Sequence, residues 1–154
     1  MEMHGERRIP ASREIVWQGL NDPAILKICI PGCETIEKIS ATEFAAKVVA
    51  RVGPVKATFA GKVTLSDLDP PAGYTISGEG TGGVAGFAKG GATVALSEEN
   101  GETVLRYGAQ GQVGGKLAQI GSRLVDGVAR KMADEFFTRF VAAVSPEGGE
   151  PEPR

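Results

Sequence analysis

One run of apolar residues, between Gly114 and Val144, constrains the fold of this chain more than any other feature. Its apolar side chains recur every three or four residues, which is the period of an amphipathic helix with a broad apolar face. We therefore predict one continuous helix over 114–144, roughly 40 Å long, that must be covered by another element. The predicted apolar face consists of Leu117, Ile120, Leu124, Val125, Val128, Met132, Phe136, Phe137, Phe140, Val141 and Val144.

Two glycines, Gly121 and Gly127, interrupt this predicted helix. Each costs about 1 kcal/mol of helix stability relative to alanine. Glycines retained at that cost indicate close approach by another backbone, or room left for another molecule.

After Gly32 the apolar period changes from about four to two, which is typical of half-buried strands. Gly53-Pro54 and Asn100-Gly101 are turn signals, and Asn-Gly is the strongest short hairpin signal. These patterns predict an antiparallel meander with one apolar face. The predicted strands cover 35–40, 43–52, 55–66, 74–80, 88–97 and 103–113.

The first 32 residues predict a strand over 2–9 and then two short helices. Ser12 is suited to be the N-cap of a helix that ends near Asn21-Asp22. A second helix, over 23–28, begins with Pro23, whose missing N–H costs nothing in a first helical turn.

A sheet with one apolar face and a long amphipathic helix are best combined by curling the sheet around the helix. The predicted class is α+β, in one domain over 1–145. The inward sheet positions, however, carry small residues. Either they let the helix sit close to a bent sheet, or they leave an apolar cavity of the kind that binds ligands. The small inward residues are Ala46, Ala50, Ala57, Gly61, Gly78, Gly80, Ala92, Ala109 and Gly111.

Composition narrows the classes of function. The 154 residues include 17 basic and 19 acidic side chains, and the pI is about 5.5, whereas nucleic-acid-binding domains usually carry a basic patch and a high pI. No run approaches the ~18 apolar residues of a membrane span, and 1–8 is too polar for a signal peptide. We expect a cytoplasmic protein that binds no nucleic acid, with a disordered polar tail over 146–154.

Residues able to catalyse a reaction are few. His4 is the single histidine and lies near the N-terminus, so no Ser-His-Asp or Cys-His arrangement is expected. Cys29 and Cys33 have no second pair with which to complete a zinc site, and we interpret them as two buried or half-buried thiols. The sequence thus predicts no catalytic residues, no metal and no covalent cofactor.

Two further motifs have ordinary interpretations. The glycine-rich segment 78–91 resembles a phosphate-binding loop, but such loops lead into a helix, and here both flanks are predicted strands. Asp126 with Arg130, and Glu135 with Arg139, are expected to form exposed i,i+4 ion pairs on the helix.

The order of the turns indicates where a cavity would open. In an up-and-down meander, Gly53-Pro54 and the turn at 80–86 lie at one end, where the C-terminal helix also begins. Trp17 and Phe136 are expected in the core at the opposite, closed end. The residues expected to contact a ligand are Val52, Ala57, Phe59, Val84, Phe87, Tyr107, Leu117, Ile120, Gly121 and Leu124.

Several segments, taken in order, resemble the carbon monoxide dehydrogenase G-subunit family of the START-like helix-grip superfamily. They are VWQGLNDP (16–23), CIPGCE (29–34), VGPVKATFAGKV (52–63), LSDLDPPAGY (65–74), GEGTGGVAGFAKGGATVAL (78–96) and VGGKLAQIGSRLVDGVARKMADEFF (113–137). The resemblance covers about 3–144. It implies a strand, two small helices, a six-stranded meander and a long C-terminal helix.

The resemblance also implies a function. Members of that family accompany molybdenum hydroxylases of the aerobic carbon monoxide dehydrogenase type, and are thought to couple them to the membrane with a quinone or lipid in the cavity. It therefore implies a non-catalytic accessory protein, with hydroxylase subunits and the inner face of the membrane as partners. Some relatives end in an apolar extension, whereas this chain ends in nine polar residues after 145.

Two other functions stay open. A START-like cyclase or hydrolase acting on an apolar substrate would place converging polar groups in the cavity, whereas the predicted inward set is apolar apart from Tyr74 and Tyr107. A chaperone for maturation of the hydroxylase would share the same family resemblance.

Overall fold

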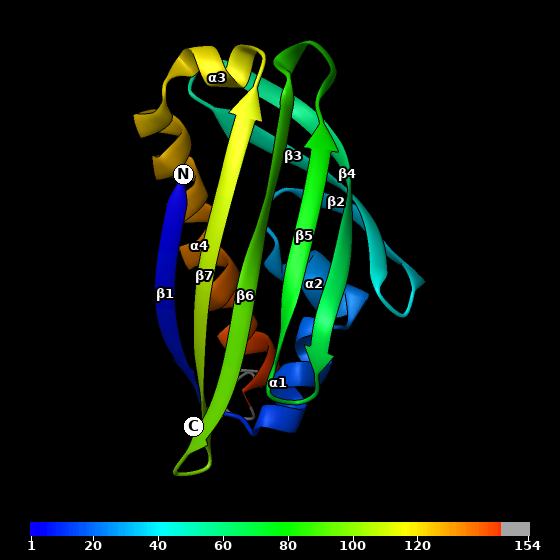
Figure 1. Cartoon of the computed structure of the whole chain (residues 1–154), viewed down its shortest axis with the longest axis vertical. Coiled ribbons are helices and arrows are strands. Elements are labelled where there is room, and N and C mark those ends of the chain that lie inside the picture. Colours follow the sequence, from blue (N-terminus) through cyan, green and yellow to red (C-terminus); the bar gives the residue numbers. More distant parts are fainter. Residues whose placement is uncertain (146–154) are drawn as a thin grey trace, which may run out of the picture.

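The computed structural model describes residues 1–145, so the predicted tail over 146–154 lies outside the described residues. Its sheet is antiparallel and has seven strands in the order β1-β7-β6-β5-β4-β3-β2 (Figure 1). The predicted meander is confirmed, with β1 added at one edge beside β7. The strands are β1 (Glu2–Ile9), β2 (Cys33–Ser40), β3 (Glu43–Val52), β4 (Val55–Asp69), β5 (Gly73–Thr81), β6 (Phe87–Glu99) and β7 (Glu102–Gly114).

The strands form where apolar and polar residues alternate. In β4 half-buried and exposed residues alternate from Val55 to Leu65, because successive side chains point to opposite faces of a sheet. The tight turns lie where the sequence predicted them. Val52 pairs with Val55 around Gly53-Pro54, and Asn100 and Gly101 have the positive φ values of 54° and 80° that a tight hairpin requires.

Two short helices, α1 (Arg13–Leu20) and α2 (Pro23–Cys29), follow β1. The Ser12 hydroxyl accepts a hydrogen bond from the Ile15 backbone N–H at 3.3 Å, which confirms the predicted N-cap. Asp22 caps α2 in the same way, by accepting from the Ala24 N–H at 2.9 Å.

The prediction of one continuous C-terminal helix is wrong. The chain forms α3 (Lys116–Ile120) and α4 (Ser122–Val144), separated by Gly121. Gly121 has φ 108° and ψ 145°, a conformation that is open to glycine and closed to residues with a Cβ. The apolar period continues across the break, so periodicity alone could not reveal it. Gly127 remains inside α4.

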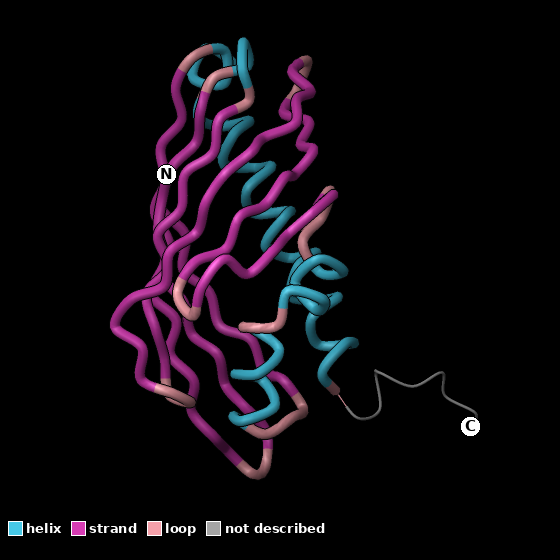
Figure 2. Tube along the Cα trace, turned by 90° about the vertical axis from the view of Figure 1, so that its right-hand side faces the viewer, coloured by secondary structure: helices cyan, strands magenta, loops and turns pink. Residues whose placement is uncertain are grey.

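The long helix α4 runs along one face of the sheet (Figure 2). Its C-terminal half packs against α1 and α2, and Phe140 is completely buried there. The predicted core positions of Trp17 and Phe136 are confirmed, since both pack against the buried cluster. That cluster consists of Ile9, Ala11, Val16, Leu20, Cys29, Phe44, Leu65, Tyr74, Leu96, Leu105 and Phe140.

Candidate functional site: an apolar cavity under the N-terminal half of α4

A cavity of about 750 Å³ lies between the sheet and the N-terminal half of α4. Ligand sites for small molecules usually measure about 300–1,000 Å³, so this volume suits one ligand of moderate size. The apolar side chains that line it come from the N-terminal Met1, five strands and two helices. They are Met1, Ala46, Val48, Ala50, Val52, Phe59, Val63, Ile76, Ala88, Ala92, Val113, Leu117, Ala118, Val125, Val128, Ala129 and Met132.

Glycines form much of the floor of this cavity. Gly78 pairs with Gly90, and Gly90 pairs with Gly111, so one row of three neighbouring strands carries no side chain at all. In the next row of paired residues, Gly61 of β4 lies beside Gly80 of β5. Because these positions are empty, the sheet cannot fill the space below the helix.

The two interpretations of the small residues apply to different strands. A Cβ on Gly78 would lie 3.5 Å from its nearest neighbours, and one on Gly80 would be equally unhindered. A Cβ on Gly61 would collide with the Glu79 carbonyl oxygen, and one on Gly90 with that of Gln110. The backbone is therefore packed closely at Gly61 of β4 and Gly90 of β6, whereas Gly78 and Gly80 of β5 have room for a Cβ in ordinary van der Waals contact.

The helix side leaves the cavity unfilled because of where its aromatic residues lie. Phe136, Phe137 and Phe140 all belong to the C-terminal half of α4, where Phe136 stacks on Phe140 with ring centroids 5.6 Å apart. The N-terminal half offers only smaller side chains, such as Val125 and Ala129. Before the N-terminal end of α4, Gly121 separates this helix from α3. Leu117 of α3 is 4% exposed.

Polar side chains on α4 are few at the cavity. Ser122 and Asp126, one helical turn apart, both belong to the lining, and Asp126 is half-buried. The predicted ion pair between Asp126 and Arg130 does not form within residues 1–145, whereas Glu135 and Arg139 do pair at 3.7 Å. Asp126 thus offers a carboxylate that no described residue engages.

The structure brings some of the predicted ligand-contacting residues together at this cavity. Val52, Phe59, Leu117 and Gly121 line it. Ala57 is outside the lining, although its strand partner Ala50 belongs to it.

Tyr107 and Ile120 lie outside the lining for different reasons. Tyr107 covers Gly5 of β1 and stacks on Phe137 with ring centroids 5.4 Å apart, so it belongs to the core. Ile120 lies against the β3–β4 turn, since a Cβ on Gly53 would lie 3.7 Å from Ile120 Cγ2.

The remaining predicted residues lie on the outside of the same end. Leu124 also contacts the β3–β4 turn and is 46% exposed. Val84 is in the short 3-10 helix η1 (Gly83–Ala85) and is 84% exposed, and the Phe87 ring covers Gly114 with 42% exposure.

Sequence reasoning missed several lining residues on α4, among them Val125, Val128, Ala129 and Met132. The helical period placed Val125, Val128 and Met132 on the apolar face, but nothing in the pattern showed which part of that face meets the cavity. Ala129 was not assigned to that face. On the sheet, the small inward residues Ala46, Ala50 and Ala92 were the signal, and all three line the cavity.

The thiols and the histidine lie away from the cavity lining. Cys29 is buried and Cys33 half-buried, both are free, and burial raises the pKa of each thiol. His4 is exposed on β1. Within residues 1–145, no group of His, Cys, Asp and Glu side chains could hold a metal ion, and no helix is long and apolar enough to cross a membrane.

An antiparallel sheet curled over a long C-terminal helix, with two short helices after the first strand, defines a helix-grip protein. Solved structures share this fold. An aromatase/cyclase from Streptomyces sp. R1128 is 13% identical, with a TM-score of 0.65, over 96% of this chain and 94% of that one. A protein from Chromobacterium violaceum is 16% identical, with a TM-score of 0.71, over 94% and 98% of the two chains.

Sequence comparison identifies the family. Residues 5–145 match the model of CoxG, the G subunit of carbon monoxide dehydrogenase, and the chain belongs to this family. A conserved protein from Geobacillus kaustophilus is 30% identical over 96% of this chain and 97% of its own, with a TM-score of 0.88. No curated protein matches the sequence significantly.

Proposed function

We propose that this chain is a non-catalytic carrier that binds a quinone or lipid in the cavity below α4. In this proposal it serves as an accessory protein of a molybdenum hydroxylase of the aerobic carbon monoxide dehydrogenase type, and helps to couple that enzyme to the membrane. The observation that carries the proposal is the cavity itself, about 750 Å³ in volume and walled mainly by apolar side chains and glycine backbone. Membership of the CoxG family supports the choice of partner.

The wall chemistry favours a carrier over an enzyme. A catalytic site needs a nucleophile or base oriented by a second polar group. The strands add Lys62, Glu79, Lys89, Gln110 and Gln112 to the lining, but these residues are exposed and alternate with the inward positions. On α4 the polar lining residues are Ser122 and Asp126, and neither cysteine nor the histidine belongs to the described lining. Such a lining suits a ligand that has an apolar body and one polar head group.

Native mass spectrometry of the purified protein, followed by solvent extraction, tests the carrier function. We expect a bound apolar molecule that survives desalting. A short-chain quinone added at 100 times its Kd should stabilise the emptied protein by about 2.7 kcal/mol, because it binds only the folded state. Absence of a bound mass together with an unchanged melting curve would overturn the proposal.

The Asp126 carboxylate should determine which redox form of a quinone head group binds more tightly. A carboxylate only accepts hydrogen bonds, so it should bind the hydroxyls of a reduced quinone better than the carbonyls of the oxidised form. Under anaerobic conditions, Asp126→Asn should reduce the ratio of quinol to quinone affinity, since an amide offers both donor and acceptor. Asp67→Asn, outside the lining, is the control. An unchanged ratio in Asp126→Asn would show that Asp126 does not contact the head.

Association with the hydroxylase needs a separate test. Mixing the purified protein with the molybdenum hydroxylase of the same organism should give a complex that elutes earlier in size-exclusion chromatography. A ligand-binding protein that never co-elutes with the enzyme would keep the carrier function and lose the proposed partner.

A further inference from the structure

One end of the molecule carries basic side chains and lacks acidic ones. We define this cavity end as residues 51–56, 82–87 and 115–124, which comprise the β3–β4 turn, η1 with its flanks, and α3 with the start of α4. These segments contain no Asp or Glu, although the chain has a net charge of −2. Their charged residues are Arg51, Lys56, Lys116 and Arg123.

The three segments meet in space. Leu124 contacts the β3–β4 turn at Gly53, and a Cβ on Gly86 would collide with the carbonyl oxygen of Gly114. Figure 1 shows α3 beside the β5–β6 connection at the upper end of the sheet. All four basic side chains of the cavity end are exposed, and none of them forms an ion pair within the described part of the chain.

The same end displays apolar side chains to solvent. Val84 is 84% exposed, and Phe87 and Leu124 are 42% and 46% exposed. Val84 stands between Gly83 and Gly86, whose φ values of 63° and 109° form a tight loop that projects it outward. Phe87 and Leu124 lie against Gly114 and the β3–β4 turn and expose the rest of their side chains. None of the three residues belongs to the cavity lining, and such a shallow apolar surface suits a deformable partner better than a rigid one.

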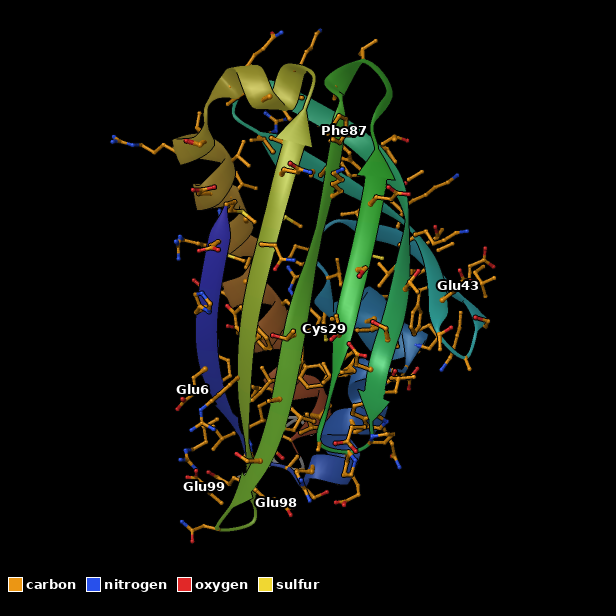
Figure 3. The ribbon with its side chains drawn as sticks, in the orientation of Figure 1. Glu6, Cys29, Glu43, Phe87, Glu98 and Glu99 are labelled. Carbon is orange, nitrogen blue, oxygen red and sulfur yellow. The ribbon has the colours of Figure 1, made fainter. Side chains whose placement is uncertain are left out.

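The opposite end has the opposite charge. Glu98, Glu99 and Glu102 flank the β6–β7 turn, and Asp67 and Asp69 end β4. Arg8 pairs with Glu99 and Glu102 there, so these five acidic residues outnumber the one arginine that pairs with them within residues 1–145. Figure 3 shows Glu98 and Glu99 at the far end of the molecule from Phe87. A negative surface therefore attracts the cavity end and repels the other, which orients the molecule before contact.

We infer that the cavity end docks on an anionic lipid bilayer. The four basic residues lie at the phosphate level while Val84, Phe87 and Leu124 enter the interface, as in other peripheral proteins that combine both attractions. The inference rests on the proposed function, because docking there brings the cavity next to the bilayer. Leu117 and Gly121 belong both to the cavity end and to the cavity lining.

Co-sedimentation with lipid vesicles tests this surface on the full chain. We expect binding to phosphatidylcholine vesicles containing phosphatidylglycerol, little binding to phosphatidylcholine alone, and loss of binding in high salt. Each basic residue near an anionic surface strengthens binding about fivefold. Lys56→Gln with Arg123→Gln should therefore weaken binding about 25-fold, whereas Lys27→Gln with Lys131→Gln, outside the cavity end, should change it little.

The apolar contribution has its own pair of variants. Val84→Ser should weaken vesicle binding severalfold, while Ile28→Ser, which alters a 65% exposed residue of α2, should not. Equal losses in both double charge variants, equal binding to both vesicle types, or no binding to either would overturn the inference.

The outcomes separate this inference from the proposed function. A protein that binds a quinone in solution but never sediments with anionic vesicles keeps the carrier function and loses the docking surface; an acidic protein partner would then be the occupant to test. Vesicle binding through the cavity end without any bound quinone or lipid in the cavity would keep the surface and remove the carrier function.

Discussion

Arg7 of β1 donates a hydrogen bond from Nη2 to Asp134 Oδ1 of α4 at 2.6 Å, and its guanidinium lies 5.0 Å from the ring centroid of Phe137. This contact joins the edge strand of the sheet to the helix that spans it. The Arg7 side chain is 29% exposed and that of Asp134 is 71% exposed. The ion pair is therefore screened by water, whereas the contact with the ring is more protected.

The first prediction separates these two contacts. Asp134→Ala should lower the free energy of unfolding by less than about 1 kcal/mol, because exposed ion pairs contribute little. Arg7→Ala should cost about 1–2 kcal/mol, since it also removes the interaction with the aromatic ring. Urea denaturation measures both. Equal losses in the two variants would mean that the ring contact contributes nothing.

The second prediction concerns the two glycines of the C-terminal region. Gly121→Ala should destabilise the protein by about 1–3 kcal/mol, because φ 108° is strained for any residue with a Cβ. Gly127→Ala should stabilise it by up to about 1 kcal/mol, because Gly127 is helical and has nothing within 4 Å of its Cβ position. Thermal denaturation should give shifts of opposite sign. Stabilisation by both would indicate that α3 and α4 join into one helix.

The third prediction concerns the core at the C-terminal half of α4. Phe140 is completely buried, and Phe140→Ala should cost about 3–5 kcal/mol. Arg139→Ala, at the preceding position, removes only an exposed pair with Glu135 and should cost less than about 1 kcal/mol. Chemical denaturation measures both variants. Similar losses of unfolding free energy would mean that the helix face assigned to the core is wrong.

The fourth prediction concerns the volume of the cavity. Gly78→Val adds a side chain where the nearest atoms are 3.5 Å from the new Cβ, and valine suits a strand. Stability should remain level or rise while the affinity for a quinone falls at least tenfold. Ser77→Val, at the adjacent exposed position on the other face of β5, should leave the affinity unchanged. A large loss of stability in Gly78→Val would mean that the floor is closely packed there too.

The fifth prediction concerns alkaline pH. Burial raises the pKa of Tyr74 well above its usual value near 10. The unfolded chain therefore releases this proton at a lower pH than the folded chain does, and the free energy of unfolding must fall as pH rises above about 10. In Tyr74→Phe the same fall should be smaller. Denaturation curves at pH 8 and pH 10.5 give the comparison, and identical slopes would contradict it.

Much of the fold could be predicted from local patterns. The alternation in β4 and the Asn100-Gly101 turn are properties of neighbouring residues, and the structure has both. The break at Gly121 could not be predicted in this way. Its apolar neighbours keep a helical period, and one glycine changes the backbone direction without altering that period.

The cavity was harder to predict than the fold, because its lining depends on contacts between distant segments. Tyr107 has the inward orientation that strand alternation predicts, yet Gly5 on β1 leaves room for its ring, and Phe137 on α4 holds it in the core. Leu124 follows the helical period, yet it lies against the β3–β4 turn and not in the cavity lining. Neither relationship is visible in the residues adjacent to them in sequence.

The unequal glycines of the cavity floor limit how this scaffold can change its choice of ligand. A Cβ can be added at Gly78 and Gly80 without a collision, whereas at Gly61 and Gly90 the neighbouring strand blocks it. Among these four floor glycines, adaptation to a shorter or narrower ligand must therefore arise on β5. A protein engineer who reshapes the site should randomise Gly78 and Gly80 and hold Gly61 and Gly90 constant.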